Sequence, residues 1–431
     1  MTYNITNNNL KHITSIVFLF VFVFVIIKPM EFFPDSEGYI NMSIIRSATY
    51  PLFLYIIKSI FGSYFNIATC FFQITLGLFA VYFFVSQLKK NIQINAFWYL
   101  CLSIILLIPY IYNHNIANSF LSEAVSYPLY LIVVAHYISL FISKETKHLI
   151  IALPLLFLLI GTRSQFIFMI PIGVLILAWI SYKNASFKKN AWLLLLLMCF
   201  PFITSIADKT YHKIKHNHFV NTPWTGIVLI SPALYVANED DLSIFKSKEE
   251  SQFFEMAYKQ LSEKKLNIHH LSTQSKGNKI STFISQYSEI ANNTVLKVGK
   301  NLTDPNLDAN ETFIKIDTLT RKMAFPLILK NNKQWLKLYI KNIVHGFGNS
   351  KIMLLYFILL IYSLISLQKK ASNENKLFVL ILALTFFNIS LIAIGIHTIK
   401  RFTFYNDWGL FLIIFVLLNT FSLIKKEKLN I

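Results

Sequence analysis

Residues 31–54 read EFFPDSEGYINMSIIRSATYPLFL and follow directly on the first membrane-length apolar run of the chain. The stretch places two carboxylates, Asp35 and Glu37, and one guanidinium, Arg46, at the edge of a segment that is otherwise apolar. Ionisable groups at the boundary of a bilayer are costly, so a cluster of them indicates a functional site. We therefore expect the chemistry of this chain to take place beside its first apolar run.

The composition is that of a polytopic membrane protein. Apolar residues make up 55% of the 431 residues, charged residues make up 14%, and the mean hydropathy is +0.52. A soluble domain carries about 25% charged residues. The formal net charge of +19 favours membrane lipids and phosphate-bearing lipid ligands as partners, and no nucleic acid, because most of the chain is apolar enough to lie in a bilayer. Cys70, Cys101 and Cys199 fall inside apolar runs, so no disulfide framework is expected.

Ten apolar runs approach the length of about 20 residues that a membrane-spanning helix needs. They lie at about 13–27, 64–88, 95–112, 119–142, 148–160, 166–180, 191–206, 353–367, 377–396 and 408–424. Residues 207–335 are polar and fit no span. The sequence therefore predicts an all-α integral membrane protein of about ten transmembrane helices. Its parts are an N-terminal transmembrane module at 1–206, a large, mainly helical loop region at 207–350 and C-terminal transmembrane helices at 351–431.

The positions of the lysines predict the orientation of these helices. Lysines that follow alternate runs all lie on one side of the membrane, and short lysine-rich loops face the cytoplasm. The large loop, the 31–54 stretch and the turns at 113–122, 161–165 and 397–407 then share the outer face. Residues 38–61 are amphipathic with a break at Tyr50-Pro51, which predicts two short juxtamembrane helices. The Lys-, Asn- and Ile-rich composition favours a bacterial inner membrane, with the site facing the periplasm or exterior.

Arginine is used sparingly and only on the predicted outer face. The chain holds 36 Lys but four Arg, namely Arg46, Arg163, Arg321 and Arg401. A guanidinium offers a rigid fork that matches phosphate or carboxylate, whereas an ammonium is a point charge. Since Arg46, Arg163 and Arg401 stand at span ends, they are predicted to bind one shared anionic ligand. The alternative is that each pairs with a lipid headgroup or a nearby acid.

Two acids are candidates for catalysis. Asp35 could take a proton from an attacking hydroxyl or hold a divalent cation, although Pro34-Asp35-Ser36 also suits a helix start. Asp35 ranks above Glu37, because residues two apart point to different sides of a helix. Glu123 lies about one turn inside the fourth predicted span, where a buried acid needs a partner or a role.

Three further segments carry histidines. His114, in the 113–122 turn, is a candidate ligand or proton relay, although a lone loop histidine is more often neither. The tract at 211–218 has no acidic or cysteine partner at ligand spacing, so it is interpreted as a basic solvated strip, and no metal site is predicted. Arg401 belongs to the aromatic and basic segment at 397–408, which would also suit an ordinary interfacial belt.

These residues together resemble the glycosyltransferase-C superfamily of membrane enzymes, which use polyprenyl-phosphate sugars as donors. The resemblance is carried by Pro34-Asp35-Ser36-x-Gly38-Tyr39 after the first span, by the segment from Arg46 to Tyr50-Pro51, and by Ser122-Glu123, Arg163 and Arg401. It covers the first seven predicted spans. Many members carry adjacent Asp-Glu, whereas this chain has Asp35-Ser36-Glu37.

The resemblance implies a function in polysaccharide biosynthesis at the cell envelope. Asp35 would be the catalytic base, Glu123 would assist it, and Arg46, Arg163 and Arg401 would bind the donor phosphate. Substrate-binding roles are also expected for Glu37, Tyr39, Tyr50 and His114. The acceptor would be an extracytoplasmic glycan, lipid or protein, transfer would proceed with inversion, and a divalent cation, Mg²⁺ or Mn²⁺, is possible but not required.

Two other functions fit the same general features. A surface-polysaccharide polymerase or ligase of the O-antigen type is also polytopic, with outer arginines and a large outer loop, but it would place its key Arg and His in the large loops. A transporter or lipid flippase would show inverted repeats and polar residues near mid-span. The sequence shows no internal repeat.

Overall fold

The computed structural model describes residues 7–112, 115–271 and 279–429, and within them the regular structure is helical. One isolated parallel β-bridge joins Glu31 to Ser119. The chain divides into two compact units. The first unit comprises Met1–Ser205, Tyr356–Phe387 and Phe404–Ile431, and the second comprises Ile206–Leu355 and Asn388–Thr403.

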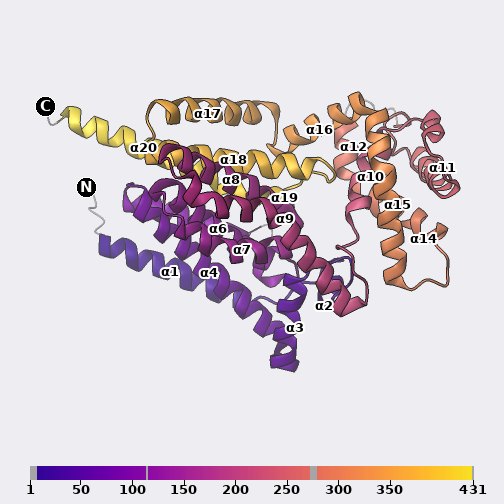
Figure 1. The fold of residues 1–431 in the computed structure, drawn as a ribbon. Helices are drawn as coiled ribbons and strands as arrows, with labels where there is room; N and C mark the ends of the chain where they lie inside the picture. The colour runs from indigo at the N-terminus through magenta and orange to yellow at the C-terminus, as the bar shows by residue number, and fades with distance from the viewer. Residues whose placement is uncertain (1–6, 113–114, 272–278, 430–431) are drawn as a thin grey trace. The chain divides into compact units, whose positions relative to one another are not determined.

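Long apolar helices build the first unit, and Figure 1 shows several of them with their axes running in roughly the same direction. They are α1 (Asn7–Ile26), α4 (Phe65–Asn91), α5 (Ala96–Ile111), α6 (Glu123–Ser143), α7 (Lys147–Thr162), α8 (Met169–Lys183), α9 (Phe187–His216), α17 (Ser350–Lys369), α18 (Asn373–Ala393) and α20 (Asp407–Leu429). The end of α9, the start of α17 and the end of α18 belong to the second unit. Each predicted apolar run falls mostly within one of these helices. Among the described residues, eight helical segments are long and apolar enough to cross a membrane, and three shorter helices, α1, α7 and α10 (Thr225–Val236), are also apolar. The prediction of an all-helical integral membrane protein is thus confirmed.

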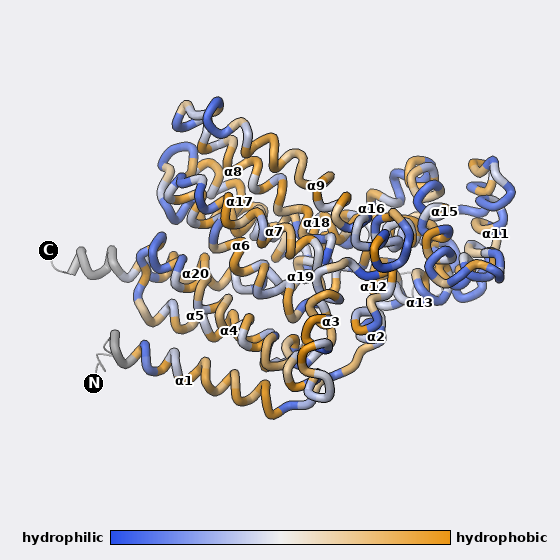
Figure 2. The backbone as a smooth tube through the Cα atoms, turned by 60° about the horizontal axis from the view of Figure 1, so that its bottom comes forward, coloured by the Kyte–Doolittle hydropathy of each residue, from blue (hydrophilic) through white to orange (hydrophobic). Residues whose placement is uncertain are grey.

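Helix α6 forms the core of the first unit. Every residue from Glu123 to Phe141 is buried, and α6 packs against α4, α7 and α8. A helix that is apolar all round must be surrounded by other helices. By contrast, many large apolar side chains of α9 and α17 are exposed, and Figure 2 shows both helices as mostly hydrophobic. Exposed apolar faces of this kind suit contact with lipid chains rather than water.

The stretch at 31–54 contains the helix α2 (Ser36–Ile40) and the start of the helix α3 (Thr49–Phe61). The predicted break at Tyr50-Pro51 is wrong. The segment between the two helices lies earlier, after Ile40 at the end of α2 and before Thr49 at the start of α3. Pro51 lies in the first turn of α3, where its missing N–H costs no hydrogen bond. The reversal after α2 passes through Met42, which has a positive φ of 53°.

The second unit is a smaller helical assembly around α10 (Thr225–Val236). Its other elements are α11 (Lys248–Glu263), α12 (Lys279–Ser285), α13 (Tyr287–Ile290), a π-helix (Ala291–Leu296), α14 (Lys297–Leu302), α15 (Ala309–Lys330), α16 (Asn332–Gly346), α19 (Lys400–Thr403) and a 3-10 helix (Glu239–Ile244). Helices α10 and α15 pack closely at Gly226, where an added Cβ would lie 2.2 Å from the Asp317 carbonyl oxygen. Only glycine permits this approach of the two backbones.

The last two turns of α9 correct the expectation for the histidine tract at one residue, His212, whereas Lys213 and Lys215 are exposed as expected. Helix α9 continues to His216, and the side chain of His212 is fully buried. The Nε2 atom of His212 lies 3.6 Å from Asp208 Oδ1 and 3.2 Å from the Thr222 hydroxyl. At His212 the tract is therefore not solvated, and an acidic partner lies one helical turn away. Asp208 and His212 are four residues apart, so they lie on the same side of the helix. They meet because α9 extends past the end of the apolar run.

Candidate functional site

Asp35 and Arg46 form an ion pair in the first unit. The Nη2 atom of Arg46 donates to Asp35 Oδ1 at 2.7 Å, and the two side chains are 19% and 33% exposed, respectively. Asp35 is the N-cap residue of α2, but its side chain makes no capping hydrogen bond. The guanidinium carbon lies 4.6 Å from the centre of the Tyr39 ring, in a cation–π arrangement. A Cβ at Gly38 would lie 2.9 Å from Arg46 Nε, so this glycine leaves room for the arginine.

Glu123 and Arg163 form a second, more deeply buried ion pair. The Nη1 atom of Arg163 lies 2.7 Å from Glu123 Oε1, and the side chains are 12% and 3% exposed, respectively. Glu123 is the first residue of α6, and Arg163 directly follows α7. The Ser122 hydroxyl donates to the other carboxylate oxygen of Glu123 at 3.4 Å. Tyr405 interacts with both charged groups, so the buried carboxylate is surrounded by compensating polar groups.

The two ion pairs are connected through polar side chains. The Tyr39 hydroxyl, whose ring lies under Arg46, donates to the Ser122 hydroxyl at 3.2 Å. Tyr50 packs edge-on against Tyr39 with ring centres 5.1 Å apart, and its hydroxyl donates to Gln73 Oε1 at 2.8 Å. The structure thus brings together the first loop, the segment before α6 and the end of α7. Six predicted residues meet there: Asp35, Tyr39, Arg46, Tyr50, Glu123 and Arg163.

The described contacts do not place the other three predicted residues, Glu37, His114 and Arg401, in this cluster. Glu37 is exposed on α2, and His114 lies outside the described residues. Arg401 belongs to the second unit, in α19, where its guanidinium carbon lies 5.9 Å from the Phe402 ring centre. A single anion site shared by all three arginines therefore stays a prediction. Arg46 and Arg163 each pair with a nearby acid, as the alternative interpretation predicted.

Sequence reasoning missed three residues of this cluster, namely Gln73, Ser126 and Tyr405. Gln73 is a fully buried amide in the middle of α4, and its Nε2 donates to the Ala117 carbonyl oxygen at 2.8 Å. Tyr405 is fully buried, and its hydroxyl lies 2.7 Å from that of Ser126. A glutamine inside an apolar run was the signal that could have located the first of them, because a polar group at membrane depth needs an internal partner.

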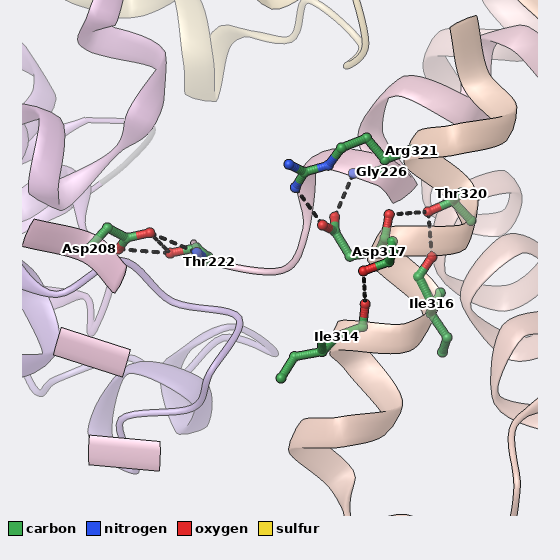
Figure 3. A network of polar contacts seen from close by, with 9 residues as sticks. Asp208, Thr222, Gly226, Ile314, Ile316, Asp317, Thr320 and Arg321 are labelled. Atoms are coloured by element: carbon green, nitrogen blue, oxygen red, sulfur yellow. Dashed lines mark hydrogen bonds and ion pairs between the residues drawn. The ribbon is translucent and has the colours of Figure 1, made fainter. Parts of the chain in front are cut away.

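The fourth arginine, Arg321 of α15, belongs to a separate polar network in the second unit. Arg321 Nη2 donates to Asp317 Oδ2 at 2.5 Å, and the other oxygen of Asp317 accepts the Gly226 N–H at 2.6 Å (Figure 3). In the same view Asp208 accepts from Thr222, which lies in the loop before α10. An open cavity of about 380 Å³ lies between residues 209–223 and α15. Its cationic lining consists of Lys209, Arg321 and Lys322.

The second unit also contains His397, a half-buried imidazole in the segment between α18 and α19. Its Nδ1 lies 2.7 Å from the Ile284 carbonyl oxygen, and its ring stacks on Tyr287 with centres 4.6 Å apart. Burial lowers the pKa of His397; the hydrogen bond to Ile284 opposes this shift, whereas His345 and Arg401 reinforce it. The unfolded chain therefore binds more protons than the folded chain at mildly acidic pH.

This depressed pKa predicts a pH-dependent stability. The contribution of His397 to the free energy of unfolding is fully present above the pKa of the unfolded chain, about 6.5. It decreases as the pH falls through that value towards the lower folded pKa. Replacement of His397 by Gln should flatten this acidic limb, because the amide cannot take up the proton. Denaturant titrations of the purified protein at a series of pH values, followed by tryptophan fluorescence, measure the effect. An unchanged slope in His397→Gln would rule the imidazole out as its source.

Comparison with known proteins leaves the function to be argued from this geometry. No protein-family model, curated protein or solved structure matches the chain. The fold defines an integral membrane protein made of helices, and its first unit holds two connected acid–arginine pairs at helix ends.

Proposed function

We propose that the chain is a membrane glycosyltransferase that moves a sugar from a polyprenyl-phosphate donor to an extracytoplasmic glycan, lipid or protein. The observation that supports this proposal is the convergence of Asp35–Arg46 and Glu123–Arg163 through Tyr39 and Ser122. In this proposal α1 and α7 also cross the membrane, giving about ten spans. The site faces the periplasm or exterior of a bacterial inner membrane.

Asp35 is the group best suited to act as the base. Its carboxylate is one-third exposed, so an acceptor hydroxyl can reach it. In the proposed step the acceptor oxygen bonds to the anomeric carbon as the bond from that carbon to the phosphate oxygen breaks. The proton passes to Asp35, and the bonding electrons leave with the lipid phosphate. Attack from the face opposite the leaving group inverts the configuration.

Arg46 is suited to bind the donor phosphate and to stabilise its charge as it leaves. Because Arg46 already contacts Asp35, an arriving phosphate competes with that carboxylate for the guanidinium. Such competition would free Asp35 to accept a proton only when the donor is present. The cation–π contact with Tyr39 holds the arginine in place during this exchange.

Glu123 has a different role in this proposal from the catalytic one predicted from the sequence. Its carboxylate is 3% exposed and pairs with Arg163, so an acceptor cannot reach it directly. Through Ser122 it fixes the hydroxyl that accepts from Tyr39. Glu123 and Arg163 thus act as positioning residues beneath the first loop.

The test is transfer by the purified full-length protein in lipid nanodiscs. Supplied with polyprenyl-phosphate hexoses and lipid extracts as acceptors, the protein should release polyprenyl phosphate in step with a glycosylated product, detected by mass spectrometry. Surface and lipid-linked glycans of cells with and without the protein would identify the acceptor. Movement of the donor across the bilayer without bond cleavage would support a flippase. Chain extension from lipid-diphosphate oligosaccharides would support a polymerase.

A further inference from the structure

Three metal-binding side chains converge in the second unit from segments far apart in the sequence. His218 lies in the loop that follows α9, whereas Asp308 and Glu311 lie at the start of α15. One potential ligand atom from each of the three side chains lies within 4.8 Å of the others. The sequence gives no hint of this meeting, because the acidic partners of His218 are about ninety residues away.

The two acids already have a structural role, but it leaves them able to bind an ion. They form the capping box of α15, in which Asp308 Oδ1 accepts the Glu311 N–H at 2.8 Å. In return Glu311 Oε2 accepts the Asp308 N–H at 3.2 Å. Each carboxylate therefore keeps a second oxygen for other contacts. A capping box needs no histidine, so the presence of His218 points to a further use of this corner.

The ligand set indicates the kind of ion. One imidazole nitrogen with two carboxylate oxygens suits Zn²⁺ or Mn²⁺ better than Ca²⁺, which prefers oxygen ligands alone. Bonds of about 2.0–2.2 Å to such an ion require these side chains to rotate towards it; Asp308 is exposed, and His218 and Glu311 are half-buried. Three protein ligands would leave at least one coordination position open.

Residues that line the cavity described above follow directly after His218 in the sequence. Phe219, the residue after His218, lines the cavity together with Val220, Asn221 and Pro223 of the same loop. The opposite wall comes from α15, whose first turn carries Glu311. The loop and the helix that would share the ion are therefore the two walls of the cavity.

We propose that His218, Asp308 and Glu311 bind a divalent cation of the Zn²⁺ or Mn²⁺ class. The ion ties the loop at 217–223 to α15 and so fixes one wall of the cavity. Lys209, Lys322 and the Arg321–Asp317 ion pair line that cavity, and the excess of positive charge favours a ligand with a phosphate or carboxylate group. This proposal does not depend on sugar transfer in the first unit.

Metal titration of the purified full-length protein tests the proposal. After treatment with chelator, calorimetry with Zn²⁺ and Mn²⁺ should show one saturable ion per chain, with Mg²⁺ and Ca²⁺ binding more weakly. Asp308→Asn, Glu311→Gln and His218→Gln should each lower the affinity by about tenfold or more. The first two changes keep the helix cap, because Asn and Gln serve these positions as well. Glu255→Gln, at an exposed acid of α11, is the matched control.

Hydrogen exchange supplies a second measurement that does not depend on any enzymatic activity. Bound ion should slow exchange at residues 217–223 in the wild type and in Glu255→Gln, but not in the three ligand variants. The proposal is overturned if the wild type binds neither Zn²⁺ nor Mn²⁺. It is equally overturned if the ligand variants bind the ion as tightly as the wild type does.

Discussion

Replacement of Asp35 by Asn should lower kcat/KM for sugar transfer by about 10²–10⁴-fold, which is the range for the loss of a general base. The amide has the same shape as the carboxylate but cannot take a proton from the acceptor hydroxyl. The cost in stability should be small, about 1 kcal/mol or less, because both side chains of the Asp35–Arg46 pair are partly exposed. Initial rates at varied donor concentration, with thermal unfolding in parallel, separate the two effects.

A second variant distinguishes catalysis from support of the loop. Arg46→Gln leaves the carboxylate in place and removes the cation proposed to bind the donor phosphate. It should therefore raise KM for the donor, whereas Asp35→Asn should mainly lower kcat. Glu31→Gln, at an exposed acid in the same loop, is the control. Full activity of Asp35→Asn would contradict the proposed mechanism and favour a polymerase, which would not need an acid at this position.

The helices were predictable because the bilayer imposes a simple condition on the sequence. A segment that crosses it must be long, apolar and hydrogen-bonded within itself, and each predicted run indeed falls in a helix. The ends of the helices were less predictable, because they depend on local contacts. Helix α3 begins at Thr49 because Pro51 is tolerated in a first turn. Helix α9 extends past residue 206 because Asp208 and His212 find partners at Thr222.

The candidate site was predictable as a set of residues but not as a set of contacts. The scarcity of arginine and the position of Asp35 after the first apolar run singled out the right stretch. Nothing in the sequence showed that Arg46 would contact Asp35 or that Arg163 would contact Glu123, because each pairing depends on how the chain folds back. For the same reason, the sequence did not predict that His218 would lie close to Asp308 and Glu311. Arg401 was grouped with the others by its place at a span end, and no contact described here tests that grouping.

Replacement of Arg163 by Met should destabilise the folded protein by about 3–5 kcal/mol, the usual cost of removing one partner of a buried ion pair. Glu123 is 3% exposed, so its carboxylate would stay buried without a compensating cation. Methionine fills similar volume, which limits any loss of packing. Reversible unfolding of the purified protein in mixed micelles, read by tryptophan fluorescence, measures the change in the free energy of unfolding.

The double variant Glu123→Gln/Arg163→Met shows whether charge is the cause. If the uncompensated carboxylate causes the loss, neutralising Glu123 should restore much of the stability, so that the two changes are strongly non-additive. Lys147→Met, which removes an exposed ion pair with Glu145 at the start of α7, should leave stability unchanged. Equal destabilisation in the single and double variants would mean that Arg163 stabilises the fold through packing alone. A stable double variant with reduced transfer would instead show that the ion pair serves the proposed function. In that function the pair holds Ser122 in position to accept from Tyr39.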